Sequence, residues 1–163
     1  MKKIYIAGPD VFELDSIEIG KKLVALCEKY GYEGLYPLDN VVDFSQSKHK
    51  IAQDIYEANV AMIENADIVI ANLNPFRGKE ADSGTVWECG YGYAKGKAVY
   101  GYMQSQRNYI DTFTDTKKVD EFLVDADDKI IEDFDYPINL MIACSVNAII
   151  EGDFEDVLKS LEA

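Results

Sequence analysis

A short apolar run constrains the fold of this chain more than any other feature of its sequence. Residues 67–73 are mostly apolar and rich in β-branched side chains, which is typical of a strand buried on both faces of a sheet. A helical segment follows from Ser83, where Asp82 or Ser83 can cap the first turn, and Gly96 is a stop signal. A buried strand leading into a helix favours an α/β fold, because parallel strands need crossover connections.

Strands and helices alternate along the rest of the chain. Residues 104–129 are polar and are predicted to form a surface excursion with a short helix near residues 119–124. The other predicted strands cover residues 3–7, 34–37, 98–103 and 146–150, and the other predicted helices cover residues 16–30, 47–65, 137–144 and 154–161. The length of 163 residues suits one domain. We therefore predict a single α/β domain over residues 1–163, with a five-stranded parallel sheet flanked by helices.

The charge of the chain argues against two classes of partner. Thirty acidic residues against 16 basic residues give a net charge of −14, and the sequence has no basic block. Nucleic acid and anionic membranes attract clusters of lysine and arginine, so we predict neither as a partner. No stretch approaches the roughly 18 apolar residues that a membrane span needs. Small neutral or cationic substrates are easier to accommodate.

The cysteine and histidine content argues against a metal or a redox site. Cys27, Cys89 and Cys144 are an odd number without CxxC spacing, and the single histidine leaves no metal-ligand cluster. We expect the cysteines to pack in the interior. The sequence also lacks a dinucleotide fingerprint and a P-loop. We therefore expect a soluble cytoplasmic protein without metal or cofactor.

Glu88 is the strongest candidate for a catalytic residue. On a helix it lies one turn after Gly84 and one turn before Gly92, so a ligand could lie directly against the backbone beside it. Unpaired N–H groups and the positive dipole at a helix start favour an ionised carboxylate, which a nucleophile needs. Asp82 would lie at the rim of the same pocket, and two carboxylates can divide catalytic roles. The alternative is that Glu88 is a solvated helix residue and Asp82 only a cap.

The topology rule for parallel sheets predicts where these residues would meet a ligand. Ligands bind outside the carboxyl ends of the strands, which brings residues 8–12, 37–40 and 72–82 together with the start of the Glu88 helix. The first of these loops is acidic, with Asp10 followed by Glu13 and Asp15. Like charges repel, so this loop disfavours a phosphate.

Several aromatic residues and one cation near these loops admit two interpretations. Tyr5, Phe12 and Trp87 could stack on a planar ligand, or they could pack in the core. Arg77 lies in a loop and could contact a substrate or pair with neighbouring carboxylates.

Four ordered motifs carry a resemblance to a known family. Residues 3–9 (KIYIAGP), 37–40 (PLDN), 82–91 (DSGTVWECGY) and 137–141 (PINLM) resemble landmarks of the nucleoside 2-deoxyribosyltransferase family. The resemblance spans nearly the whole chain. It implies a flavodoxin-like sheet and an enzyme that exchanges the base of a 2′-deoxyribonucleoside for a free nucleobase.

The resemblance also implies roles for individual residues. Glu88 matches the nucleophile that attacks C1′ of the sugar, and Asp82 matches the carboxylate that contacts or protonates the leaving base. Tyr5 matches the tyrosine that orients the nucleophile, and Phe12 matches an aromatic wall of the pocket. The family has an aspartate in the base-binding region where this chain has Asn59, so the preference for purines or pyrimidines stays open.

Two further matches imply a shared site. Asn139 matches an asparagine that a neighbouring subunit contributes to the sugar hydroxyls and the nucleophile, and Met141 matches a residue near it. The resemblance therefore implies a homo-oligomer, a dimer or larger, with Asn139 crossing an interface.

Two alternative functions remain open from the sequence. A 2′-deoxynucleoside 5′-monophosphate N-glycosidase would use water in place of the second base and would need a phosphate site. Ser83 and Gly84 near a helix start could supply donors for it, although the acidic first loop argues against this hydrolase. A non-catalytic nucleotide-sensing module on the same fold is the third possibility, because a fold does not fix a function.

Overall fold

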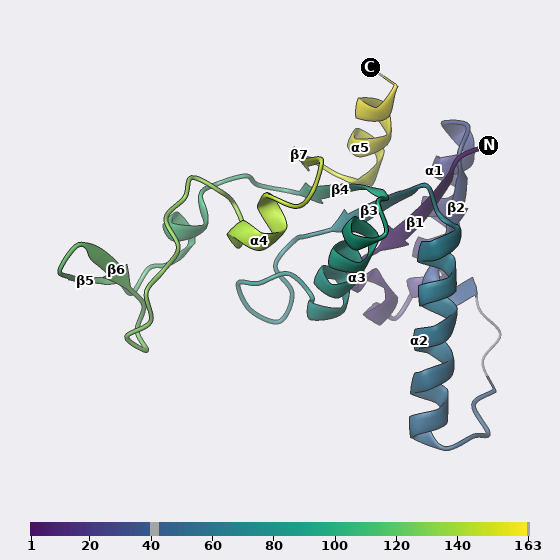
Figure 1. Cartoon of the computed structure of the whole chain (residues 1–163), viewed down its shortest axis with the longest axis horizontal. Helices are drawn as coiled ribbons and strands as arrows, with labels where there is room; N and C mark the ends of the chain where they lie inside the picture. The colour runs from purple at the N-terminus through teal and green to yellow at the C-terminus, as the bar shows by residue number, and fades with distance from the viewer. Residues whose placement is uncertain (40–42, 163) are drawn as a thin grey trace.

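The sheet at the centre of the molecule has the strand order of the flavodoxin-like folds. The structure is a computed structural model that describes residues 1–39 and 43–162 (Figure 1). Its five parallel strands lie in the order β2-β1-β3-β4-β7, which is one of the two common doubly wound arrangements. Their bounds are β1 (Lys3–Ala7), β2 (Glu33–Leu35), β3 (Ile68–Asn72), β4 (Ala98–Met103) and β7 (Ala148–Glu151). The predicted fold class is confirmed.

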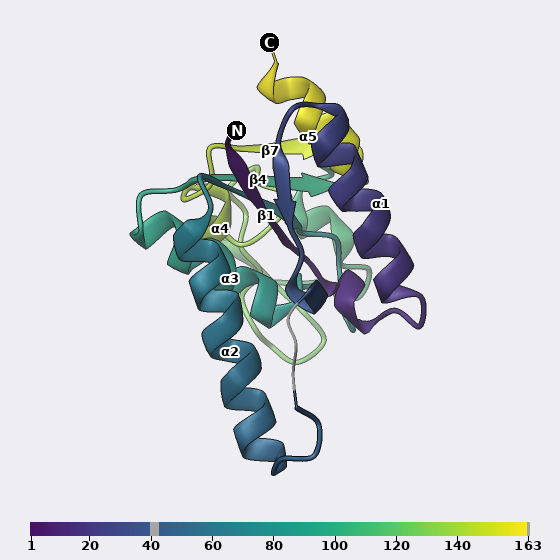
Figure 2. The same ribbon diagram turned by 90° about the vertical axis from the view of Figure 1, so that its right-hand side faces the viewer.

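Helices cover both faces of this sheet. Figure 2 shows α1 (Ser16–Lys29) and α5 (Phe154–Leu161) on one side of the strands, with α2 (Lys48–Asn65), α3 (Ser83–Ala94) and α4 (Leu140–Ala143) on the other. Three short 3-10 turns lie in loops: η1 (Pro9–Phe12), η2 (Pro37–Asp39) and η3 (Tyr109–Thr112). No helix in the described ranges combines the length and the apolar composition needed to cross a membrane.

Alternation along β1 divides its side chains between two cores. Ile4 and Ile6 belong to the core beneath α1 and α5, whereas Tyr5 and Ala7 belong to the core beneath α2 and α3. Successive side chains of a strand point to opposite faces, so this division follows from the sequence. It places the fully buried Tyr5 side chain under α3.

Helix α5 completes the core on the α1 side. Phe154, Val157 and Leu158 are each at most 3% exposed. Glu155 on the same helix accepts hydrogen bonds from Lys29 Nζ at 2.6 Å and from the Tyr30 hydroxyl at 3.0 Å. The last helix of the fold is therefore held against α1, which forms near the start of the chain.

A glycine sets how closely α3 packs on the sheet. A Cβ atom at Gly92 would lie 2.9 Å from Cγ2 of Val69 on β3, which is too close for an ordinary contact. The interpretation that Gly92 leaves bare backbone for a ligand is therefore wrong, because this glycine faces the sheet. Gly96 follows the helix with a φ of 70°, as expected of a helix stop.

In the structure the excursion extends over residues 104–139, between β4 and α4, and most of it projects away from the sheet (Figure 1). The predicted short helix near residues 119–124 is wrong, because this stretch forms a hairpin of β5 (Lys117–Val119) and β6 (Phe122–Val124). Asp120 has a φ of 53° in the two-residue turn, a conformation that tight hairpins require and aspartate tolerates. Three of the six strand residues, Val119, Phe122 and Val124, are β-branched or aromatic, which favours strand over helix.

Two smaller expectations also need correction. The helix predicted at residues 137–144 is limited to α4, because the Asn139 side chain caps it by accepting from Met141 N at 2.9 Å. Cys144 is exposed, whereas Cys27 and Cys89 are buried as expected. Asn40, in the predicted loop at 37–40, lies outside the described residues.

Candidate active site

A cavity of about 580 Å³ lies beyond the carboxyl ends of β1 and β2 and beside the start of α3. Its walls are mainly apolar side chains from the loops and from α1 and α2, including Val11, Phe12, Ile17, Leu38, Phe44 and Ile55. The polar side chains in its lining include Asn59, Asp82 and Glu88. An apolar concavity with a few convergent polar groups is typical of a small-molecule site.

Glu88 is held in this cavity by a tyrosine from the central sheet. The Tyr5 hydroxyl donates a hydrogen bond of 2.5 Å to Oε1 of Glu88. Burial raises the pKa of Tyr5, and the negative charge of Glu88 raises it further, so the hydroxyl keeps its proton at neutral pH. The bond brings together two of the predicted catalytic residues from positions far apart in the sequence.

The environment of Glu88 differs from the one expected of a helix start. Burial raises the pKa of Glu88 to about 7, the Tyr5 hydrogen bond opposes this rise, and the charge of Asp82 adds to it. The direction of this pKa shift is therefore opposite to the one expected from a helix start, which favours the ionised carboxylate. The unpaired N–H groups of α3 are in its first turn, and Glu88 lies beyond that turn. The removal of Glu88 from water therefore raises its pKa by more than the helix dipole lowers it.

Asp82 both caps α3 and lines the cavity, so it occupies both of the positions that the sequence left as alternatives. Its Oδ2 accepts hydrogen bonds from Thr85 N at 2.8 Å and from Thr85 Oγ1 at 2.9 Å, which caps α3. The same side chain lines the cavity beside Glu88. Thr85 is only 1% exposed. It was missed from the sequence, although its position three residues after a predicted cap is where a capping partner is expected.

An aromatic stack with a cation lies beside the cavity wall. The rings of Phe12 and Phe76 stack with centroids 5.4 Å apart. The Arg77 guanidinium lies 5.3 Å from the centroid of Phe12 and 4.7 Å from that of Phe76. Within the described ranges, no carboxylate is paired with Arg77 by a salt bridge. Its contacts are cation–π contacts that connect the loops after β1 and β3.

Of the other predicted residues near α3, two line the cavity and one does not. Gly84 and Asn59 are in its lining. Trp87 lies outside it, stacked on Tyr91 at 5.1 Å and in edge contact with Tyr56. The interpretation of Trp87 as a stacking platform for a ligand in this cavity is therefore wrong.

The structure does not bring Asn139 or Met141 into the Glu88 cavity of the same chain. Asn139 instead lines a separate cavity of about 220 Å³ within the excursion, together with Tyr109 and Glu132. Met141 is 72% exposed. Both residues lie on or next to α4, which packs near α3.

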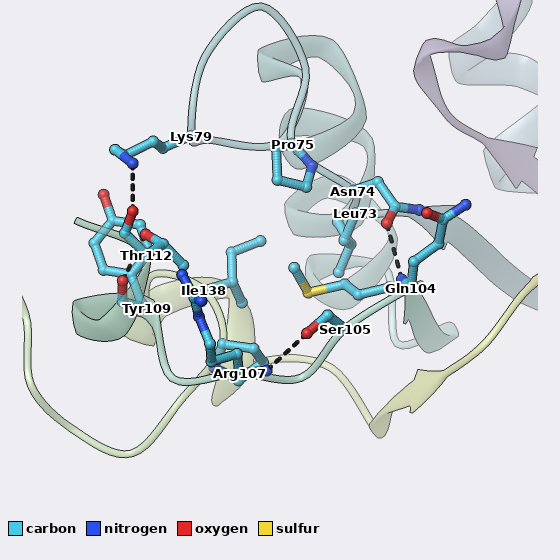
Figure 3. Close-up of a pocket in the computed structure, with 12 residues that line it drawn as sticks. Leu73, Asn74, Pro75, Lys79, Gln104, Ser105, Arg107, Tyr109, Thr112 and Ile138 are labelled. Atoms are coloured by element: carbon cyan, nitrogen blue, oxygen red, sulfur yellow. Dashed lines mark hydrogen bonds between the residues drawn. The ribbon is translucent and has the colours of Figure 1, made fainter. Parts of the chain in front are cut away.

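A further cavity of about 330 Å³ lies beyond the carboxyl ends of β3 and β4 (Figure 3). Lys79 Nζ donates to the Thr112 carbonyl at 2.5 Å across it, and Gln104 N donates to Asn74 Oδ1 at 2.9 Å. None of the eight site residues predicted from the sequence is in its lining. Among the described residues, no group of three or more histidine, cysteine, aspartate or glutamate side chains is arranged to hold a metal ion.

The doubly wound sheet, with a tyrosine-supported carboxylate in an apolar cavity at its carboxyl edge, defines a flavodoxin-like protein with a paired-carboxylate site. The family model described as nucleoside 2-deoxyribosyltransferase matches residues 4–141. The chain belongs to this family.

Similar proteins of known structure share this fold. A structure described as a 2-desoxiribosyltransferase from Leishmania mexicana is 29% identical, with a TM-score of 0.78 over 99% of this chain and 98% of that chain. A 2-deoxyribosyltransferase from Bacillus psychrosaccharolyticus is 23% identical, with a TM-score of 0.62 over 96% of this chain and 90% of that chain.

A relative found by sequence is an uncharacterized protein of Schizosaccharomyces pombe, which is 30% identical over 118 residues. Those residues are 71% of this chain but only 56% of that protein.

Proposed function

We propose that this protein transfers the 2-deoxyribosyl group of a 2′-deoxyribonucleoside from one nucleobase to another, with Glu88 as the nucleophile. The observation that carries the proposal is the Glu88 carboxylate, held at 2.5 Å by Tyr5 inside a cavity of about 580 Å³. Family membership supports an enzyme that acts on the glycosidic bond of nucleosides. The Leishmania mexicana transferase supports the finer activity, because the likeness extends over 99% of this chain.

The chemistry needs a carboxylate beside the anomeric carbon. An oxygen of Glu88 bonds to C1′ as the bond from C1′ to the base breaks, through a state with oxocarbenium character that the carboxylate stabilises. Asp82 lies at the same cavity and would contact the leaving base. In its protonated form it gives this base a proton, and the carboxylate so formed takes the proton that the second base releases when it attacks. A second base then attacks C1′ and releases Glu88, so the sugar keeps its configuration and the kinetics are ping-pong.

The remaining cavity residues have supporting roles in this proposal. Tyr5 orients the Glu88 carboxylate, and its bond to Oε1 leaves Oε2 for the attack. Phe12 forms an apolar wall for the base, Asn59 offers an amide to its polar edge, and Gly84 lets the ligand approach the helix backbone.

The shared-site proposal assigns Asn139 and Met141 to the cavity of a second copy. Its support is that neither residue lines the Glu88 cavity of its own chain and that Met141 is 72% exposed. In a homo-oligomer, Asn139 would contact the sugar hydroxyls beside the partner subunit's Glu88. The proposed partners are therefore a 2′-deoxyribonucleoside, a free nucleobase and another copy of the chain.

The cavity chemistry favours a nucleoside over a nucleotide. Its described lining contains two carboxylates but no lysine or arginine. A 5′-monophosphate would meet like charge there, and the described lining has no lysine or arginine to offset it. The monophosphate hydrolase therefore has less support than the transferase.

Incubation with deoxyinosine, with and without adenine, tests the proposed function. We expect deoxyadenosine to form only when adenine is present, and mass spectrometry to detect a deoxyribosyl group on Glu88 after incubation with deoxyinosine alone. Hypoxanthine release without deoxyadenosine would indicate a hydrolase. Binding without base release would indicate a sensing module.

Substitution of the nucleophile gives the sharpest prediction. Glu88→Ala should lower transfer by about 10⁴-fold or more, because the covalent route is lost. Circular dichroism should remain that of the wild type, since Glu88 is at a cavity wall. Near wild-type transfer by a folded Glu88→Ala protein would refute the assignment.

A further inference from the structure

A carboxylate in the excursion brackets the start of α4. Oε1 of Glu132 accepts a hydrogen bond from Asn139 Nδ2 at 2.6 Å, and Oε2 accepts one from Leu140 N at 2.9 Å. Both bonds are partly buried. Hydrogen bonds to a carboxylate are stronger than those between neutral groups, so this bracket restrains both residues at the same time.

The bracket also fixes which way the Asn139 amide points. An ionised carboxylate only accepts, so the amide nitrogen must face Glu132. On the other side, Asn139 Oδ1 accepts from Met141 N at 2.9 Å, so the oxygen must face the backbone of α4. The amide keeps one N–H and one oxygen lone pair for another group. A hydroxyl, which both donates and accepts, complements this pair.

Both ends of the bracket are anchored in packed structure. Ile131 precedes Glu132, is 6% exposed, and its N–H donates to the Leu123 carbonyl of β6 at 3.0 Å. Ile138 precedes Asn139, is 3% exposed, and belongs to the core beneath α3. The carboxylate therefore connects the projecting excursion to the helix layer that carries Glu88.

We propose that Glu132 is a positioning residue that holds Asn139 in the orientation needed to bind a sugar hydroxyl of the deoxyribonucleoside. This inference rests on the proposed function, because it takes from it the contact of Asn139 with the sugar. It gives the excursion a role in substrate recognition, and it gives a function to the Glu132 carboxylate where the excursion meets α4.

A double-mutant cycle tests the proposal with transfer from deoxyinosine to adenine. In Glu132→Gln, the side-chain N–H₂ faces one of the two donors, Asn139 Nδ2 or Leu140 N, so one of the two hydrogen bonds of the bracket is lost. We expect kcat/KM to fall about tenfold for Glu132→Gln and about tenfold or more for Asn139→Ala. The double variant should be no worse than Asn139→Ala, because Glu132 acts through that side chain. Additive losses, to about a hundredfold, would overturn the proposal.

The matched control is Asp133→Asn, which removes a carboxylate from the next, exposed residue. It should leave kcat/KM within twofold of the wild type. Wild-type transfer by Glu132→Gln, while Asn139→Ala is impaired, would refute the positioning role alone. Wild-type transfer by Asn139→Ala would refute the proposed contact of Asn139 itself, and with it the positioning role.

A second measurement separates positioning from a loss of folding. Glu132→Gln subunits mixed with Glu88→Ala subunits should regain transfer, because the Glu88→Ala subunit supplies an intact Glu132 and Asn139 to the other cavity. A protein that simply failed to fold would regain none. The absence of recovery from variants with wild-type melting curves would also count against the proposal.

Discussion

The behaviour of Glu88 depends on its neighbours more than on its place in a helix. Sequence spacing identified Glu88 and Asp82 as a pair, because a helix start can be located from its cap and its glycines. The contact with Tyr5 came only from the resemblance, because 83 positions separate the two residues and sequence spacing does not report such contacts. Removal of Glu88 from water is likewise a property of the folded cavity, so the direction of its pKa shift was mispredicted.

The raised pKa of Glu88 predicts how activity depends on pH. Attack on C1′ needs the ionised carboxylate, and burial raises the pKa of Glu88 to about 7. We expect kcat/KM to increase as the pH rises through about 7 and to level off above it. The check is a pH profile of transfer from deoxyinosine to adenine. A flat profile between pH 5 and pH 8 would contradict the assignment.

Two neighbours should shift this profile in opposite directions. Tyr5→Phe removes a hydrogen bond that lowers the pKa of Glu88, so the rising limb should move to higher pH. Asp82→Asn removes a negative charge that raises the pKa of Glu88, so the limb should move to lower pH. Asparagine can still cap α3, so Asp82→Asn should change the pH profile without unfolding the helix. Shifts in the same direction for both variants would argue against this account.

At the level of elements, the sequence correctly predicted the helices and strands whose hydrophobic periodicity and stop residues indicate the same bounds. The strand positions in the sheet and α1, α2, α3 and α5 were found within a few residues of their observed bounds. The hairpin of β5 and β6 was predicted as a helix, because its strands are too short to show a clear period of two. The helix predicted over 137–144 was too long, because the capping contact of Asn139 depends on side-chain geometry.

The close packing of α3 gives a prediction with an internal control. Gly92→Ala should lower the free energy of unfolding by about 1–3 kcal/mol, because its Cβ would press on Val69. It should also lower transfer, since displacement of α3 moves Glu88 from Tyr5. Gly90→Ala, on the exposed side of the same helix, meets no atom within 4 Å. It should stabilise the helix by about 0.5–1 kcal/mol. Urea unfolding measures both values, and equal effects would show that Gly92 has no special packing role.

At the level of the whole molecule, the projecting excursion distinguishes this chain from a minimal sheet with flanking helices. Composition predicted that residues 104–129 lie at the surface. It did not predict that the segment would return to bracket α4, because that contact depends on two side chains in different segments. The proposed contribution of Asn139 to a second copy of the chain would likewise depend on an assembly, which composition does not predict.

Mixing of two impaired variants, Glu88→Ala and Asn139→Ala, tests the shared site. Glu88→Ala subunits lack the nucleophile, and Asn139→Ala subunits lack the contributed amide. In mixed dimers, one of the two cavities would contain both residues. We expect roughly a quarter of wild-type transfer after co-expression, because about half of the dimers are mixed and half of their cavities are complete. If each chain builds its own complete site, co-expression will not raise transfer above the residual activity of Asn139→Ala alone.

The position of α5 has a consequence for synthesis of the protein. Phe154, Val157 and Leu158 cover strand surface that α1 alone does not seal. Ribosome-bound chains that lack α5 should therefore expose an apolar face of the sheet and bind chaperones. We expect limited proteolysis of such nascent chains to cut within the sheet until residues 154–161 have emerged, and resistance before that point would show that the sheet matures without them. Translation pauses before residues 154–161 have emerged would then prolong the most aggregation-prone stage of biogenesis.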